Sequence, residues 1–71
     1  LDMAAAKSAY ESLTPREKDI LRLIIAGKRN IRIADELCIA MRTVEVHRAN
    51  LLKKFSAKTV AELAYIYGKL D

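Results

Sequence analysis

Residues that interrupt regular secondary structure are rare in this chain, and their scarcity limits its fold more than any other feature. The 71 residues include one proline and two glycines, which are Pro15, Gly27 and Gly68. No stretch alternates apolar and polar residues for long enough to predict a β-strand. Apolar residues instead recur at helical spacing between these interruptions. The sequence therefore predicts an all-α fold made of short helices.

Local signals place the first two helices. Residues 3–12 are rich in alanine, and they predict either an additional N-terminal linker helix or the end of a linker. The run Thr14-Pro15-Arg16-Glu17 combines a hydroxyl N-cap, a proline at a position that needs no N–H, and a glutamate able to reach back to the cap. The helix that starts there is predicted to end at Gly27, which can adopt a left-handed conformation.

The sequence predicts three further helices after Gly27. Asn30 is the expected N-cap of a short helix. After a break at residues 38–40, residues 41–55 form the next helix, and Thr59 caps the last one. The two middle helices therefore stand on either side of a very short turn.

That spacing is typical of a helix-turn-helix. Two short helices cross closely only if a small residue lies at their contact, and Ala34 stands at that position. Cys38 occupies the turn, and Val44 anchors the second helix with a branched apolar side chain. We therefore predict a four-helix bundle that contains a helix-turn-helix, with the domain at residues 13–71 and the linker at residues 1–12.

Positive charge is concentrated in the middle of the chain. The net charge is +4, and residues 28–58 alone carry eight basic and three acidic side chains, which gives +5. Such a patch attracts polyanions, of which nucleic acid is the usual one. A single cysteine and a single histidine exclude an internal disulfide and a Cys/His metal cluster. We expect a cytoplasmic DNA-binding protein that is not an enzyme and uses no cofactor, metal or membrane.

The helix at residues 41–55 has one apolar face, which sets the direction of its other faces. Val44, His47, Leu51 and Phe55 are predicted to point inward. An arginine can then bond a guanine, a glutamate can accept from a cytosine amino group, and small apolar side chains can contact a thymine methyl. The residues predicted to face DNA bases are Arg42, Glu45, Val46 and Ala49, and those predicted to face the DNA backbone are Thr43, Arg48, Asn50, Lys53 and Lys54.

Several motifs resemble the LuxR-type helix-turn-helix family. They are Leu13-Thr14-Pro15-Arg16-Glu17, Gly27, Ile33-Ala34, the run Thr43-Val44-Glu45-Val46-His47-Arg48-Ala49-Asn50, and Lys53-Lys54-Phe55. Together they cover about residues 13–68, and the run from Arg42 to Asn50 is most similar to the FixJ/NarL branch of two-component response regulators.

The resemblance implies a function and a set of partners. It implies the output domain of a transcriptional response regulator, which binds double-stranded DNA through the helix at 41–55 in the major groove. It also implies an N-terminal receiver domain absent from this sequence, which fits a chain that opens on Leu1, and RNA polymerase as a further partner. Family members pair on DNA through their last helix, which implies a dimer contact at Val60, Leu63, Tyr65 and Ile66. We expect the isolated domain to be mainly monomeric.

Four positions depart from the family pattern. Cys38 and Ser56 stand where glycine is usual, and Ala40 replaces the serine that normally caps the second helix of the motif. Glu45 stands where many relatives have lysine, which implies a different target sequence or weaker non-specific binding. The first three departures concern the local geometry and stability of the turns.

Two other functions fit parts of the sequence. Region 4 of a sigma factor, which binds a promoter and polymerase, also follows a similar Pro-Arg-Glu start. A protein-interaction domain that has lost DNA binding would account for Glu45 and the modest net charge. For single residues we expect His47 to be a packed, hydrogen-bonded structural histidine, and Cys38 to be an inert packed thiol. The tyrosines are expected in core or dimer contacts rather than stacked on bases.

Overall fold

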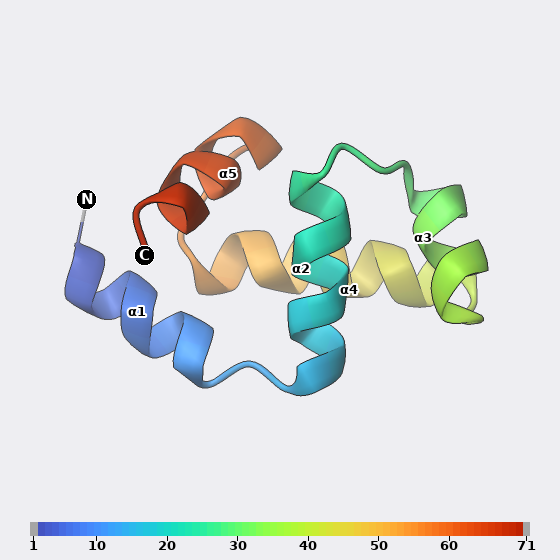
Figure 1. The fold of residues 1–71 in the computed structure, drawn as a ribbon, viewed down its shortest axis with the longest axis horizontal. Coiled ribbons are helices and arrows are strands. Elements are labelled where there is room, and N and C mark those ends of the chain that lie inside the picture. Colours follow the sequence, from blue (N-terminus) through green and yellow to red (C-terminus); the bar gives the residue numbers. More distant parts are fainter. Residues whose placement is uncertain (1, 71) are drawn as a thin grey trace.

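Residues 2–70, which the computed structural model describes, form five α-helices and no β-strand (Figure 1). The helices are α1 (Met3–Glu11), α2 (Pro15–Ile25), α3 (Asn30–Leu37), α4 (Met41–Lys54) and α5 (Val60–Gly68). The predicted all-α fold is confirmed, and the additional N-terminal helix is formed. Leu1 and Asp71, the outer limits of the two predicted ranges, lie outside the described residues.

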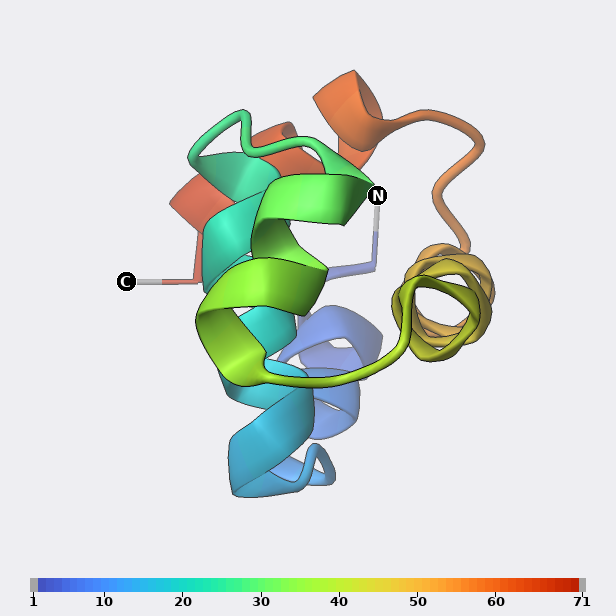
Figure 2. The same cartoon turned by 90° about the vertical axis from the view of Figure 1, so that its right-hand side faces the viewer.

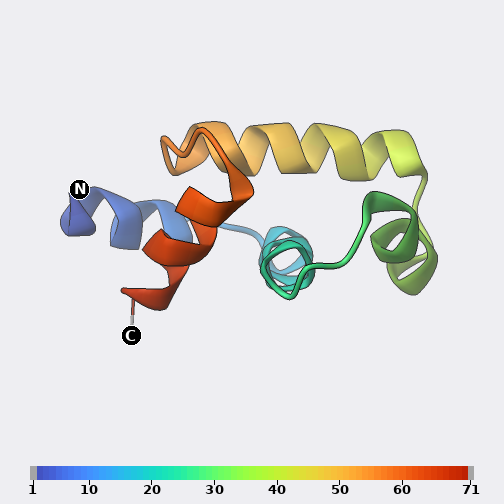
Figure 3. The same ribbon diagram turned by 90° about the horizontal axis from the view of Figure 1, so that it is seen from above.

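The longest helix, α4, lies along one side of the molecule, and the other helices lie on the same side of it (Figure 3). α2 crosses α4 near its middle, and α3 packs against its N-terminal half (Figure 1). α5 returns over the far end of α4 and packs against α2. One long face of α4 is therefore held by the core, and the opposite face meets solvent.

The core is built from the apolar faces of all five helices. Burial of such side chains is the main favourable term in folding, at about 1.5–3 kcal/mol for each large one. The fully buried side chains of this core are Ile20, Leu21, Ile24, Ile33, Val44, Leu51 and Leu63. Because they come from α2 to α5, these four helices form one packed unit.

The N-terminal helix α1 docks on this unit through a buried alanine and a tyrosine ring. Ala6 is buried in the core, and so is Leu13 in the loop that follows α1. The ring of Tyr10 meets the ring of Tyr67 of α5 edge to face, with the centroids 6.0 Å apart, and Lys18 lies 4.9 Å from the Tyr10 ring centroid. The assignment of residues 1–12 as a linker between domains stays a prediction.

The helix starts fall into two groups. Asp2, Thr14 and Thr59 cap α1, α2 and α5, because each side chain accepts a hydrogen bond from a backbone N–H three residues on. The predicted capping box of α2 is present: the Glu17 carboxylate accepts from the Thr14 N–H at 2.9 Å. In contrast, Arg29 and Ala40 precede α3 and α4 and make no side-chain cap hydrogen bond. Both helices of the helix-turn-helix therefore start without a side-chain cap.

Three helices end at a residue in the left-handed region. Gly27 after α2 has φ +85°, Cys38 after α3 has φ +56°, and Ser56 after α4 has φ +54°. In each case the next N–H returns to a carbonyl five residues back, as from Ile39 to Ala34 at 3.0 Å, which satisfies the last turn. Glycine adopts this conformation freely, whereas other residues are strained in it by about 1–2 kcal/mol. The Cys38 turn therefore carries this strain, and Ser56 after α4 is a second instance.

Candidate nucleic-acid interface

The predicted helix-turn-helix consists of α3, the turn at residues 38–40, and α4. Figure 2 shows α4 nearly end-on while α3 is seen from its side, so the two helices cross at a steep angle. Ala34 lies partly buried at this crossing, and Ile39 packs from the turn against the core. The geometry is that of two short helices in close contact.

The thiol of Cys38 does not take part in this packing. The prediction of a packed thiol is wrong, because Cys38 is exposed and Ile39, the next residue, makes the apolar contact instead. The Cys38 Sγ lies 3.9 Å from the Asp35 carbonyl oxygen.

The inward face of α4 is the predicted one. Val44 is 0% exposed, Leu51 1% and Phe55 6%, which fixes the rotation of the helix about its axis. His47 is partly buried on the side of α4 near Glu17 of α2, and no hydrogen bond of its ring is present among residues 2–70. The packed position of His47 is thus observed in part, and its predicted hydrogen bond is not.

The outward face of α4 carries the residues expected to meet DNA bases. Arg42, Glu45, Val46 and Ala49 are all exposed, and Val46 keeps 43% of its surface accessible. At about 100° per residue, Arg42, Val46 and Ala49 form a stripe opposite the buried face, and Lys53 continues this stripe. Glu45 stands at the edge of the stripe. Their accessibility is therefore established, and their contact with bases stays a prediction.

Two of these exposed residues are paired with each other. The Arg42 Nη1 lies 3.3 Å from the Glu45 Oε1, and the two side chains are 81% and 44% exposed. A pair so open to water is worth about 0.2–1 kcal/mol, so it separates easily when another partner arrives. In the free protein, Glu45 therefore offsets the positive charge of Arg42.

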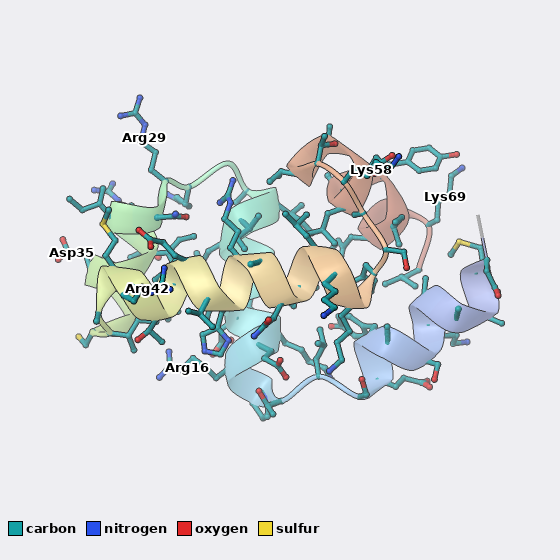
Figure 4. The ribbon with its side chains drawn as sticks, turned by 180° about the vertical axis from the view of Figure 1, so that it is seen from behind. Arg16, Arg29, Asp35, Arg42, Lys58 and Lys69 are labelled. Atoms are coloured by element: carbon teal, nitrogen blue, oxygen red, sulfur yellow. The ribbon has the colours of Figure 1, made fainter. Side chains whose placement is uncertain are left out.

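Most residues expected to meet the DNA backbone flank the same face. Thr43, Asn50, Lys53 and Lys54 are exposed, as predicted from the sequence. Figure 4 views the molecule from the side of α4: Arg42 lies on its near face, Arg16 of α2 projects below it, and Arg29 and Lys58 stand above it. Basic side chains of α2, α4 and the loops before α3 and α5 thus surround the solvent face of α4.

Arg48 differs from this group because it is partly buried and bound within the protein. Its Nη1 donates to the Oδ1 of Asn30, the first residue of α3, at 3.2 Å. The prediction that Asn30 caps α3 is wrong, because Arg29 occupies the cap position. A local start signal cannot reveal a bond across 18 positions of the chain.

The capping box of α2 lies next to this surface, and it changes the pKa of its own glutamate, Glu17. The backbone N–H of Thr14 donates to the Glu17 carboxylate and lowers the pKa of Glu17, and the positive charges of Lys54 and His47 lower it further. Glu17 therefore stays ionised close to the basic end of α4.

The last helix offers less free surface than expected. Tyr65 is 60% exposed and Val60 is partly exposed, whereas Leu63 and Ile66 are 0% and 6% exposed. Ile66, one of the implied dimer contacts, is buried, and it shares a small hollow between α1 and α5 with Ala6 and Phe55. Leu63 and Ile66 fill the core of this domain, so they present no surface to a second copy in this conformation.

Within residues 2–70, His, Cys, Asp and Glu do not gather in groups of three that could hold a metal ion. No helix in that range combines the length and apolar character needed to cross a membrane.

Comparison with known proteins decides the family. The family model described as "Bacterial regulatory proteins, luxR family" matches residues 11–67, which is most of the chain. The chain belongs to the luxR family. This assignment separates it from region 4 of sigma factors, which also fitted the Pro-Arg-Glu start.

Relatives of this luxR-family chain include proteins named as response regulators. The chain is 43% identical over 61 residues to the tetrathionate response regulatory protein TtrR of Salmonella typhimurium, covering 86% of this chain and 30% of TtrR. The structure of the response regulator StyR matches with a TM-score of 0.86 and 41% identity, covering 90% of this chain and 32% of that one. Full-length FixJ from B. japonicum matches with a TM-score of 0.81 and 37% identity, covering 96% and 35%. The chain thus spans about a third of the length of these proteins.

Proposed function

We propose that this luxR-family domain binds double-stranded DNA sequence-specifically, as the output domain of a transcriptional response regulator. One observation carries the proposal: α4 is locked by Val44 and Leu51 on one face and presents an accessible stripe of Arg42, Val46 and Ala49 on the other. The small side chains at 46 and 49 let the helix approach the floor of a major groove, which is about 12 Å wide. α4 is then the recognition helix.

The charge distribution supports a grip on the DNA backbone around that helix. Lys53 and Lys54 lie in the last turn of α4, and Arg16, Arg29 and Lys58 lie around it (Figure 4). Lysine and arginine at such positions meet phosphates and release condensed counterions, which makes affinity depend steeply on salt. Base contacts supply the sequence preference, and these phosphate contacts supply most of the affinity.

A salt titration tests the proposal. Binding of a random-sequence duplex is measured by fluorescence anisotropy between 50 and 200 mM salt. If the bound form neutralises six to ten phosphates, affinity falls by about 10³–10⁵ over this range. Lys53→Ala should lower affinity for all duplexes alike, whereas Lys7→Ala, a matched change on α1, should leave it unaltered. A flat salt dependence, or no binding at low salt, contradicts the proposal and favours a protein-interaction domain.

The proposal extends to the partners of the longer protein. In the longer protein, a receiver domain lies N-terminal to α1. Two output domains pair on DNA, and the pair recruits RNA polymerase. All of this takes place in the cytoplasm. Tyr65 and Val60 are the accessible residues of α5 for the pairing. Leu63 and Ile66 are buried, so they would support the pairing only indirectly, by packing α5 against the core. Light scattering of the isolated domain at micromolar concentration should show mainly monomer without DNA, and a tight dimer there contradicts this part.

A further inference from the structure

Arg48 is the one member of the predicted backbone-facing set that the fold itself orients. Its guanidinium donates to the Asn30 amide oxygen at 3.2 Å in a partly buried contact between α3 and α4. Among residues 2–70, no carboxylate forms a salt bridge with Arg48, whereas Lys28, Arg32 and Arg42 each have one. The charge of Arg48 is therefore held in place without being neutralised.

The surroundings of Arg48 increase this positive charge. Arg48 and Asn30 line one open groove together with Lys28 and Arg29, and no acidic side chain lines it. Lys28 is only loosely compensated by Glu36, whose Oε1 lies 4.0 Å from the Lys28 Nζ. An arginine has five N–H donors, and one bond to Asn30 leaves the others for an anion in this groove.

Asn30 gives its side-chain oxygen to Arg48 and does not cap α3. Asparagine is among the best N-cap residues, yet Asn30 sits one residue inside the helix and its side chain reaches Arg48. An aspartate there would favour the helix N-terminus electrostatically, and it would also neutralise Arg48. A neutral amide is the side chain that orients the guanidinium while keeping its charge available.

We propose that Asn30 is a positioning residue, which holds the Arg48 guanidinium in the α3–α4 groove ready for a phosphate of the DNA backbone. This inference rests on the proposed DNA-binding function. Asn30 itself reads no base, so its effect should be the same on every duplex. Its contribution comes from removing the need to order a long, flexible side chain at the moment of binding.

The test compares Asn30→Ala and Asn30→Asp, each with and without Arg48→Gln, by duplex titration at fixed salt and by thermal unfolding. Asn30→Ala should weaken binding of all duplexes by about 3–10-fold, the worth of one ordinary hydrogen bond. Asn30→Asp should weaken it more, by over about tenfold, while the melting temperature stays equal or rises. These opposite changes in binding and stability would not arise from a merely structural role.

The Arg48→Gln background decides whether Asn30 acts through Arg48. In a domain that carries Arg48→Gln, Asn30→Ala should have no further effect on affinity for the duplex. Asn30→Asp should still lower the affinity in that background, but only by the repulsion between its added negative charge and the DNA. Full affinity in a folded Asn30→Ala variant overturns the inference, and so does an equal loss in both backgrounds. If the unaltered domain binds no duplex at all, the proposed function itself fails, which is a distinct result.

Discussion

Glu45 provides the sharpest test of the proposed DNA-facing surface. It is the only acidic residue of α4, it is exposed, and it lies 3.3 Å from Arg42 on the face expected to enter the groove. A carboxylate at that place is repelled by phosphates, and a contact with a base amino group would compensate this repulsion once the pair with Arg42 separates. Replacing Glu45 with Ala should therefore change non-specific and specific binding in opposite directions.

The magnitudes follow from the exposure of this pair and from Coulomb's law. Breaking the Arg42–Glu45 pair costs little, about 0.2–1 kcal/mol, because both side chains are well exposed. For a carboxylate about 7 Å from a phosphate, Coulomb's law in water gives a repulsion of about 0.6 kcal/mol. Non-specific affinity should therefore rise by about threefold in Glu45→Ala. Discrimination at one base pair should fall by about 1–3 kcal/mol, the worth of one good base contact.

The assay is a pair of competition titrations on a selected operator. Sequences bound from a random duplex library define the operator, and all its single-base variants then compete for wild type and for Glu45→Ala. Asp35→Ala serves as the control, since Asp35 is an exposed acid of α3 at the outer edge of the motif (Figure 4). This substitution removes the same charge without changing the stripe that we expect to face the bases. If Glu45→Ala keeps every base preference of the wild type, Glu45 reads no base and the assigned DNA-facing side of α4 is wrong.

Three further predictions concern stability. Ala40→Ser should supply the missing cap of α4 and raise the free energy of unfolding by about 1 kcal/mol in urea titrations; an unchanged midpoint would show that the first turn gains nothing from a hydroxyl. Leu51→Ala should lower that free energy by about 2–5 kcal/mol, since Leu51 is 1% exposed; a loss below 1 kcal/mol would mean the core collapses around the gap. The pKa of Glu17 is lowered in the folded domain, so its ionised carboxylate stabilises the fold. This contribution to the free energy of unfolding is complete above the unfolded pKa of about 4.3, and it is lost as the pH falls through the lower folded pKa. The melting temperatures of wild type and Glu17→Gln should thus converge as the pH is lowered. If the two melting temperatures instead keep a constant difference at every pH, the lowered pKa of Glu17 is refuted.

The parts of this molecule that were predictable from sequence depend on local periodicity. The spacing of Val44, Leu51 and Phe55 was enough to predict the buried face of α4, and hence which of its residues are exposed. The capping box at Thr14 and Glu17 was equally accessible, because both partners lie within one turn. Such features involve only neighbours in the chain, so sequence order and helix geometry determine them.

The features that were missed depend on contacts between segments far apart in the sequence. The bond from Arg48 to Asn30 spans two helices, and nothing local distinguishes Asn30 from an ordinary N-cap. Ile66 is buried because α1 docks beside it, a packing that the periodicity of α5 alone does not contain. Cys38 is exposed because the left-handed turn assigns the apolar contact to Ile39. The exposed residues of the candidate site could thus be predicted from the sequence, whereas the contacts that hold them in place could not.

The two left-handed residues that bracket α4 have a consequence for entropy. Cys38 precedes the helix by a few residues and Ser56 follows it closely, and both hold positive φ without being glycine. Glycine at these places would relieve steric strain, and it would also widen the range of backbone angles open to each turn. With Cys38 and Ser56, the unfolded chain has fewer backbone conformations at both junctions than it would have with glycine, so less entropy is lost on folding. This smaller loss of entropy offsets part of the steric strain that the two left-handed residues carry.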